Sequence, residues 1–407
     1  MDILFIHQNF SGQFKSLAPA LVQSGHRVRA LTINGAGAPG VETIRYSPRR
    51  GTTPNIHAWA SDFETKIIRG EACAAEASRL KAEGYRPDVI VGHPGWGEML
   101  FLRDIWPTTP QLHFLEFYYA SNSDVGFDPE FADPNWRSQA RVRAKNASGL
   151  LNLEQMDAAY SPTNWQRSSY PAFAQSRINV IHDGIDTDMM VPKSGLSLTL
   201  SSGRELRSGM KLVTFVNRNL EPYRGYHVFM RALANMQHMV PDAFFVVVGG
   251  DGVSYGAKAP DGQSWKHIFL DEVRERVDLA RVAFVGSIPY DVFQCLMQMS
   301  AAHVYLTYPF VLSWSMLEAM ACGAPVIGSA TPPVQEVIEH GRNGLLVDFF
   351  DRQGLAETVA NVLNNPHQYV DMRLQARQTI LDKYDLNRVC LPRQMDLIQR
   401  VANGSTI

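Results

Sequence analysis

The stretch "AAHVYLTYPFVLSWSMLEAMACGAPVIGS", from Ala301 to Ser329, decides the fold class of this chain. Its opening, "AAHVYLTY", predicts a buried strand, its middle predicts a helix, and "PVIGS" predicts a second strand. Strands that alternate with helices form parallel sheets whose two faces are both covered. The stretch therefore predicts an α/β fold with a parallel sheet.

The same alternation runs along the chain in two series. The first series predicts a helix at residues 14–22 and strands at residues 2–6, 26–33, 87–93, 111–119 and 178–186. The second series predicts a helix at residues 226–236 and strands at residues 211–217, 243–252 and 282–286. A linker-like segment rich in serine and glycine, residues 186–210, separates them. We infer two doubly wound α/β domains that face each other across a central cleft, with ligands beyond the carboxyl ends of the strands.

Composition excludes several classes of protein. The chain has 407 residues, 45% of them apolar and 19% charged, which is typical of a globular protein with two or three domains. A formal charge of −2 gives no basic field for nucleic acid. The four cysteines form no C-x-x-C pair, which argues against zinc and disulfides and favours a reducing compartment. With no signal-peptide pattern and no long apolar segment, we expect a cytoplasmic protein.

Glu318 is the only charged residue between Tyr308 and Ser329. Burying a carboxylate without a hydrogen-bonding partner is costly, so Glu318 needs a partner. Two interpretations are open. Ser315 and Glu318 have the spacing of a capping box at a helix start, or Glu318 holds a hydroxyl-bearing ligand at the same helix end.

Two arginines follow a predicted strand in the second series. Arg224 lies just before the helix that begins near Gly225, where a cation opposes the helix dipole unless an anion joins it. A diphosphate would satisfy Arg218, Arg224 and the exposed helix amides together. The alternative is a pair of solvated surface arginines.

Several motifs, in this order, resemble one known family. They are "INVIHDGID" (178–186), "VNRNLEPYRGYHVFMRAL" (216–233), "GSIPYDVF" (286–293), "SMLEAMACGAPVIGS" (315–329) and "VIEHGRNGLLVDFFD" (337–351). The chain resembles the retaining, nucleotide-sugar-dependent glycosyltransferases of family 4, which have the GT-B fold. The resemblance is strongest from Val213 to Asp351, and the N-terminal half matches mainly in layout.

The resemblance implies that different segments of the chain form domains with different roles. Residues 1–190 would form a Rossmann-like acceptor domain, residues 191–385 a Rossmann-like donor domain, and residues 386–407 a helix that crosses back to the first domain. The implied reaction moves a sugar, with retention, from a nucleoside-diphosphate sugar to a hydroxyl acceptor, without a cofactor or a metal. The acceptor is a glycan, a lipid-linked glycoside or a small-molecule glycoside. A nucleotide-sugar-binding or assembly subunit without catalysis, and an epimerase of nucleotide sugars, are the alternatives.

The resemblance also assigns roles on the donor side. Arg218 and Arg224 would neutralise the diphosphate, although their spacing is one residue longer than usual and Arg replaces Lys. Glu318 matches the second glutamate of an E-x7-E motif, which holds the donor ribose. Phe310 stands where the first glutamate is expected, which puts the identity of the donor sugar in doubt. The other donor residues are Gly12 and the segments that contribute backbone groups, namely Val311, Leu312, Ser313, Trp314, Ser315, Ser287 and Ile288.

On the acceptor side, Glu116 lies near the position where the family often has a histidine of the catalytic site. His113 is the other candidate, and Glu116 has the alternative of pairing with a nearby arginine, Arg141 or Arg143. The loop "HPGWGE" (93–98) follows a predicted strand, so His93 and Trp96 would contact the acceptor; the alternative is an ordinary Pro-Gly turn.

A basic cluster accompanies Trp136 at roughly helical spacing. Its members are Arg137, Arg141, Arg143 and Lys145. Such a cluster fits weak peripheral association with the inner face of a membrane, or a solvated face of the protein.

Overall fold

The computed structural model describes residues 1–120 and 125–404, which form two compact domains. The first contains Met1–Gly184 and Asn387–Ile407, and the second contains Ile185–Leu386. The boundary therefore lies at Gly184 rather than near residue 190. Ile185 already belongs to the second domain because its amide donates to the carbonyl of Tyr384 (2.8 Å) and its carbonyl accepts from the amide of Leu386 (2.9 Å).

The first domain is built on a seven-stranded parallel sheet with the order β3–β2–β1–β4–β5–β6–β7. Every residue of β4, β5 and β6 is buried, because helices cover both faces of the sheet. The strands are β1 (Asp2–Ile6), β2 (Arg27–Thr32), β3 (Glu42–Arg45), β4 (Val89–Gly92), β5 (Gln111–Phe114), β6 (Ala158–Ser161) and β7 (Ile178–Val180).

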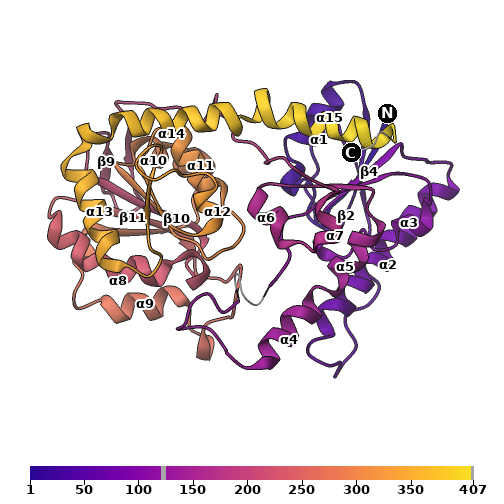
Figure 1. The fold of residues 1–407 in the computed structure, drawn as a ribbon, viewed down its shortest axis with the longest axis horizontal. Helices are drawn as coiled ribbons and strands as arrows, with labels where there is room; N and C mark the ends of the chain where they lie inside the picture. Colours follow the sequence, from indigo (N-terminus) through magenta and orange to yellow (C-terminus); the bar gives the residue numbers. More distant parts are fainter. Residues whose placement is uncertain (121–124, 405–407) are drawn as a thin grey trace. The chain divides into compact units, whose positions relative to one another are not determined.

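Eight α-helices accompany this sheet in the described part of the domain. They are α1 (Leu17–Gln23), α2 (Ser61–Ala82), α3 (Leu102–Ile105), α4 (Trp136–Lys145), α5 (Ala147–Gln155), α6 (Asn164–Ser169), α7 (Ala172–Gln175) and α15 (Leu391–Ala402). The C-terminal helix α15 lies beside α1 (Figure 1). Two side chains of α15 bind the end of β7 and the residues just after it: Arg393 donates to the carbonyl of Val180 (2.9 Å) and Gln394 to that of His182 (2.9 Å). The last helix thus belongs to the first domain.

The second domain has a six-stranded parallel sheet with the order β12–β11–β10–β13–β14–β15. Its strands are β10 (Leu212–Asn219), β11 (Phe244–Gly250), β12 (Val282–Gly286), β13 (Ala302–Tyr305), β14 (Val326–Ser329) and β15 (Leu345–Val347). The predicted linker is not wholly irregular, since it contains an antiparallel hairpin of β8 (Ser197–Thr199) and β9 (Glu205–Arg207).

Helices cover both faces of the second sheet (Figure 1). Helices α8 (Tyr226–Met239), α9 (Trp265–Val273) and α13 (Arg352–Asn364) lie on one side; α10 (Tyr290–Met299), α11 (Trp314–Ala321) and α14 (Val370–Lys383) lie on the other. The short helix α12 (Pro332–Gln335) follows β14. Side chains of α10, α11 and β10–β14 share one buried apolar core. This packing holds the start of α11, and with it Glu318, against the sheet.

Three predicted elements differ most from the structure. The strand predicted at 178–186 ends at Val180. The strand predicted at 111–119 ends at Phe114, so Glu116 lies in a loop. The helix predicted at 14–22 begins at Leu17, after a separate 3-10 turn, η1 (Gly12–Phe14).

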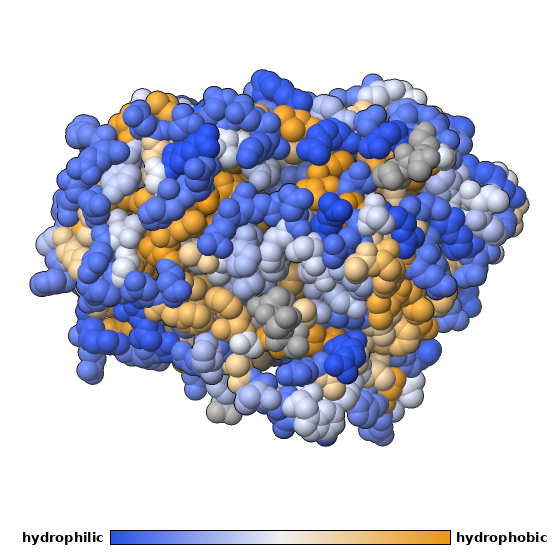
Figure 2. Space-filling view, in the orientation of Figure 1, coloured by the Kyte–Doolittle hydropathy of each residue, from blue (hydrophilic) through white to orange (hydrophobic). Residues whose placement is uncertain are grey.

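The face shown in Figure 2 is largely polar, with apolar residues in separate patches, as on most globular proteins. No helix among the described residues has the length and apolar character that crossing a bilayer requires.

Candidate functional site

The strand order reverses once in each sheet, between β1 and β4 in the first domain and between β10 and β13 in the second. Ligands of doubly wound folds bind at such reversals, beyond the carboxyl ends of the strands. Arg218 and Arg224 lie at the end of β10 and just after it, and Phe310 follows β13. His93 follows β4. Each domain therefore carries predicted site residues at its own reversal point.

Arg224 is buried, with 6% of its surface exposed, at the end of the 3-10 turn η3 (Pro222–Arg224). Its Nη1 donates to Oγ1 of Thr307 (2.9 Å) and to the carbonyl of Val311 (2.8 Å). Among the described residues, no carboxylate oxygen lies within 4.0 Å of this guanidinium. No described residue accepts a hydrogen bond from Nε or Nη2 of Arg224; the bonds are made by Nη1. A buried cation held by neutral groups favours an anionic ligand.

The backbone beside Arg224 requires glycine. Gly225 has φ +66°, and a Cβ at this position would lie 2.3 Å from Cβ of Leu306. Glycine therefore lets the η3 turn approach the segment after β13 and places Arg224 against Thr307.

Phe310 lies in an aromatic cluster around Arg224. Its ring centroid is 4.6 Å from that of Tyr255 and 5.5 Å from that of Tyr223. The guanidinium carbon of Arg224 lies 5.2 Å from the Tyr255 ring and 5.7 Å from the Phe310 ring. Contacts of this kind stabilise a desolvated cation. Phe310 is 2% exposed, so its buried ring forms part of the surroundings of the Arg224 guanidinium.

Arg218 and Glu221 complete the turn after β10. Arg218 is exposed, whereas Glu221 is 1% exposed. The Glu221 carboxylate accepts hydrogen bonds from the amides of Ser254 (3.1 Å) and Tyr255 (3.0 Å), and so fixes the loop that carries the Tyr255 ring. Burial raises the pKa of Glu221 to about 7, against the opposing effects of these amides and of the two arginines.

This raised pKa predicts a pH-dependent stability. The folded protein favours the protonated carboxyl, so the stabilisation is complete below pH 4.5, the ordinary pKa, and is lost as the pH rises through about 7. The variant Glu221→Gln should gain about 2 kcal/mol at pH 8 relative to wild type, and much less at pH 5. Its amide oxygen can keep both backbone hydrogen bonds. Denaturant unfolding at the two pH values measures the difference.

Glu339→Gln is the matched control, because Glu339 is an exposed partner of Arg342 and should show no such difference between the two pH values. Equal changes in the stability of Glu221→Gln at pH 5 and pH 8 would contradict the assignment.

Glu318 lies in the second turn of α11, with 7% of its surface exposed. Helical side chains lean toward the N-terminus, so its carboxylate is directed back to the helix start. The hydroxyl of Tyr290, the first residue of α10, donates to Oε1 of Glu318 (2.7 Å). The capping-box interpretation with Ser315 is wrong, because the N-cap of α11 is Ser313, whose hydroxyl accepts from the amide of Ser315 (3.4 Å).

Val311 to Ser313 were predicted to offer backbone groups to the donor, but backbone groups of Val311 and Ser313 are bonded within the protein. The amide of Ser313 donates to the hydroxyl of Tyr305 (2.8 Å), and the carbonyl of Val311 accepts from Arg224. Leu312 is buried in the core of the domain. Trp314 and Ser315 open α11, so their amides lie at the helix N-terminus as predicted.

Ser287 and Ile288, predicted near the nucleotide base, lie between β12 and α10. Ser287 is exposed, and Ile288 packs against the domain core.

In the first domain, His7 follows β1 and is 2% exposed. Its Nδ1 accepts from the amide of Asn9 (3.0 Å), so Nε2 carries the proton and donates to Oε1 of Gln13 (2.8 Å). Burial, followed by the nearby His93, lowers the pKa of His7 to about 4, so it is neutral at pH 7. Gly12 has φ +48°, and a Cβ there would lie 2.2 Å from the His7 ring, so the ring requires glycine at this position.

His93, Trp96 and Glu116 gather beside His7. The rings of His93 and Trp96 stack, with centroids 4.2 Å apart, and Trp96 meets the edge of His7 at 4.8 Å. Nδ1 of His93 accepts from the amide of Gly95 (3.0 Å), which leaves the proton on Nε2, 3.5 Å from Oε2 of Glu116. The predicted acceptor residues His93 and Trp96 therefore lie together with the predicted catalytic residue Glu116.

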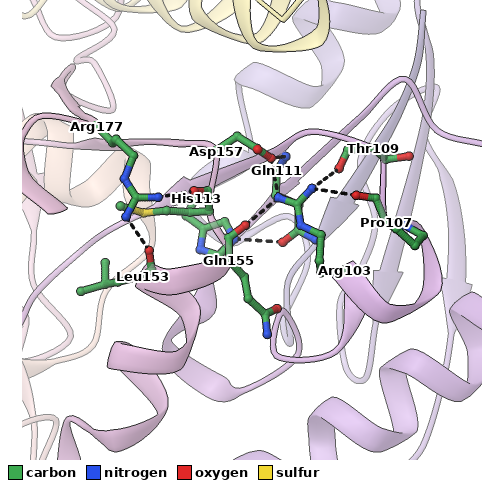
Figure 3. A network of polar contacts seen from close by, with 10 residues as sticks. Arg103, Pro107, Thr109, Gln111, His113, Leu153, Gln155, Asp157 and Arg177 are labelled. Atoms are coloured by element: carbon green, nitrogen blue, oxygen red, sulfur yellow. Dashed lines mark hydrogen bonds and ion pairs between the residues drawn. The ribbon is translucent and has the colours of Figure 1, made fainter. Parts of the chain in front are cut away.

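His113 does not join them. It lies inside β5, is fully buried, and its Nε2 lies 3.3 Å from Oε1 of Gln111 in a polar network with Arg103 and Arg177 nearby (Figure 3). Burial and these two cations lower the pKa of His113 to about 3. This burial argues against the predicted contact with an acceptor and favours a neutral core histidine.

Three residues were missed by the sequence reasoning: His7, Glu221 and Tyr290. Glu221 and Tyr290 meet their partners 28 or more residues away, and His7 meets the rings of His93 and Trp96 from a distant strand end, so no local motif marks these three residues. Within either domain by itself, the described residues bring no three histidine, cysteine or carboxylate ligands together.

Comparison with known proteins agrees with this architecture. Residues 24–190 match the family described as "Glycosyl transferase family 4 group", and residues 201–379 match "Glycosyl transferases group 1". The chain is 27% identical over 343 residues to the D-inositol 3-phosphate glycosyltransferase of Mycolicibacterium vanbaalenii, covering 80% of this chain and 69% of the relative. The enzyme of that name from Mycolicibacterium smegmatis is 28% identical, with 80% and 70% covered. Against some other relatives of this name the chain spans less than two thirds of their length.

Solved structures share the fold over the whole chain. Sucrose-phosphate synthase from Thermosynechococcus elongatus superposes with a TM-score of 0.74 at 19% identity, covering 100% of both chains. Anabaena HepE in complex with UDP and glucose superposes with a TM-score of 0.65 at 15% identity, covering 98% of both. The two family matches, the two doubly wound sheets and these neighbours lead to one conclusion: the chain belongs to the family 4, group 1 glycosyltransferases, enzymes of the GT-B fold that transfer sugars from nucleotide-sugar donors.

Proposed function

We propose that this enzyme transfers a sugar, with retention, from a ribonucleoside-diphosphate sugar to a hydroxyl acceptor, a glycan, a lipid-linked glycoside or a small-molecule glycoside. The observation that carries the donor assignment is Arg224. Its guanidinium is buried among neutral partners at the reversal point of the second sheet, with donors still available for an anion.

On the donor side, Arg224 and Arg218 would hold the diphosphate, and Glu318 would accept hydrogen bonds from the ribose hydroxyls. As the bond between sugar and diphosphate breaks, negative charge grows on the leaving phosphate. Fixed positive groups stabilise such charge without reorganisation. The arginines thus supply the positive charge that a metal ion supplies in other transferases, and the leaving diphosphate can take the acceptor proton.

On the acceptor side, the proposal uses the cluster of His7, His93, Trp96 and Glu116. His7 is neutral at pH 7 and donates from Nε2 to Gln13, while Nε2 of His93 lies 3.5 Å from the Glu116 carboxylate, so the cluster places imidazole nitrogens beside one carboxylate. The flat face of Trp96 suits the apolar face of a sugar ring. Peripheral membrane association through α4, where Trp136 is 66% exposed, stays a prediction.

A second candidate function is a nucleotide-sugar-binding subunit without catalysis. The observation in its favour is Phe310, which is buried in the position of the expected sugar-binding glutamate. Both candidates predict binding of a nucleoside diphosphate, and only the enzyme predicts its release from a donor sugar.

The test is thermal unfolding with UDP, GDP, ADP, dTDP and CMP. Anabaena HepE, which shares the fold, was solved in complex with UDP, so UDP is the first choice. At about a hundred times the dissociation constant, a ligand stabilises by about 2.7 kcal/mol, and we expect the melting temperature to rise by roughly 5–10 °C. UMP should give a smaller rise than UDP, because it lacks the second phosphate for Arg218 and Arg224.

Release of the diphosphate from the matching sugar donor, with a panel of acceptors, then separates the two candidates. Binding without release under every acceptor would favour the non-catalytic subunit. No shift with any nucleoside diphosphate would contradict both.

A further inference from the structure

Glu221 is a buried carboxyl that lies in the chain between the two arginines of the proposed diphosphate position. It follows Arg218 by three residues and immediately precedes the 3-10 turn η3, which ends at Arg224. Glu221 is 1% exposed and Arg224 is 6% exposed, whereas Arg218 is open to solvent. A buried acidic group therefore shares this short turn with the two cations that an anionic ligand would contact.

Backbone amides hold the carboxyl of Glu221 in place. Its Oε2 accepts from the amides of Ser254 (3.1 Å) and Tyr255 (3.0 Å), and its Oε1 lies 3.2 Å from the amide of Ser254. Because Oε2 can accept both bonds, a proton on Oε1 leaves the contact with this loop intact. Glu221 can therefore change its charge while the loop keeps the Tyr255 ring 5.2 Å from the guanidinium carbon of Arg224.

The charges that act on Glu221 are those of Arg224 and Arg218. The loop after β11 faces it with neutral amides, and Asp251 of that loop pairs with Lys266 (3.0 Å). Burial raises the pKa of Glu221 to about 7, although the two amides and both arginines oppose this rise. About half of the molecules therefore carry a proton on Glu221 in neutral solution.

A bound diphosphate would bring its negative charge to the same two arginines. Acidic groups that share one site disfavour each other's ionisation, so the group that holds its proton more tightly becomes protonated. The terminal phosphate of a nucleotide titrates near pH 6, as phosphate monoesters do, which is below the pKa of about 7 that burial gives Glu221. The proton therefore belongs on Glu221, and the phosphates keep their charge for the arginines.

We propose that nucleoside-diphosphate binding is linked to the uptake of one proton by Glu221, so that the donor site loses affinity as the solution becomes alkaline. The proton comes from the buffer, and it removes the carboxylate charge that would repel the phosphates. This inference rests on the proposed function and deepens it by assigning a pH-sensitive group to the diphosphate position.

The direction of the pH dependence follows from linkage. In acidic solution Glu221 is protonated before and after binding, so it contributes no change of affinity. Above about pH 7 the empty site loses its proton while the occupied site keeps it, so the dissociation constant rises with pH, by at most about tenfold per pH unit.

The experiment is calorimetric titration of the full chain with UDP at pH 7.5, 8.0 and 8.5, where the phosphates are fully ionised. If thermal unfolding selects another base, that diphosphate replaces UDP. Two buffers with different ionisation enthalpies at each pH give the number of protons taken up. We expect wild type to take up more than half a proton per UDP at pH 8.0, and its affinity to fall about fivefold from pH 7.5 to pH 8.5.

Glu221→Gln removes the titration and keeps an oxygen for the amides of Ser254 and Tyr255. It should take up almost no proton, show a flat affinity over this range, and bind UDP about tenfold more tightly than wild type at pH 8.5. Glu339→Gln is the matched control, because Glu339 is exposed and pairs with Arg342, so its proton uptake should equal that of wild type. A purely structural role of Glu221 would not change the number of protons.

The failures are distinguishable. A wild type that binds UDP without proton uptake and with a flat affinity overturns the inference and leaves the proposed function standing. Equal proton uptake by Glu221→Gln does the same, because the proton then goes to another group. The wild-type measurement decides the matter even if the variant does not fold. A wild type that binds no nucleoside diphosphate overturns both.

Discussion

Arg224→Met should reduce sugar transfer by about 10²–10³-fold, the usual effect of removing one donor that stabilises charge in the transition state. Methionine is flexible and apolar, so it can fill the space among the rings of Tyr255 and Phe310 without the charge. The affinity for a nucleoside diphosphate should fall with it, while the monophosphate should be affected less. Steady-state release of the diphosphate and calorimetric titration measure the two effects.

Arg231→Met is the matched control. Arg231 is another arginine of the second domain, and its guanidinium pairs with Glu272 through two contacts of 2.7 Å. Its replacement should change stability rather than turnover. If Arg224→Met folds and retains full turnover, Arg224 is not a diphosphate ligand.

The second large effect is expected at Glu318. Glu318→Ala should weaken nucleotide binding about 10²-fold, because two hydrogen bonds from the ribose to a charged acceptor are lost. In contrast to Arg224→Met, the loss should be equal for the monophosphate and the diphosphate, since both carry the same ribose. Titration of both nucleotides against the variant and wild type checks this.

Glu339→Ala serves as the control for the loss of a carboxylate, because Glu339 is exposed and pairs with Arg342 at 2.7 Å. It should bind both nucleotides as wild type does. Unchanged nucleotide binding to Glu318→Ala would remove the ribose assignment.

Much of the fold follows from local patterns. The inner parallel strands, such as β4, β5, β6, β13 and β14, are buried on two faces, so they appear as short apolar runs between turn residues. The helix predicted from Tyr226 differs from the observed one by three residues at its end, Met239 against Met236. The hairpin β8–β9 was missed because its short strands are partly exposed and polar, which is also the composition of a linker.

Glu116 shows why a strand pattern can extend too far. The apolar run continues after Phe114, yet backbone groups of Glu116 and Tyr119 bond to side chains instead of to a neighbouring strand. Gln166 donates to the carbonyl of Glu116 (2.6 Å), and Asn146 accepts from the amide of Tyr119 (3.3 Å). Gln166 lies in α6 and Asn146 lies between α4 and α5, both distant in sequence from these backbone groups, so periodicity cannot predict the contacts.

Some residues of the candidate site could likewise be predicted from the sequence, and others could not. Glu318 and Arg224 were predictable because a charge in an apolar run and a cation before a helix are locally unfavourable without a partner. Tyr290, Glu221 and His7 carry no such local signal. Their importance comes from contacts that exist only after folding.

The chain passes from the first domain to the second and back again, and this path affects how the second domain can be exchanged by recombination. The second domain enters at Ile185 and leaves at Leu386, and these two ends are hydrogen-bonded neighbours, with Thr187 also bonded to Asp385. In topology the second domain is an insert within the first, with both joints at one place. Recombination can therefore exchange the second domain as one piece, because its first and last segments are hydrogen-bonded to each other within the domain. A different second domain can in this way be joined to an unchanged first domain.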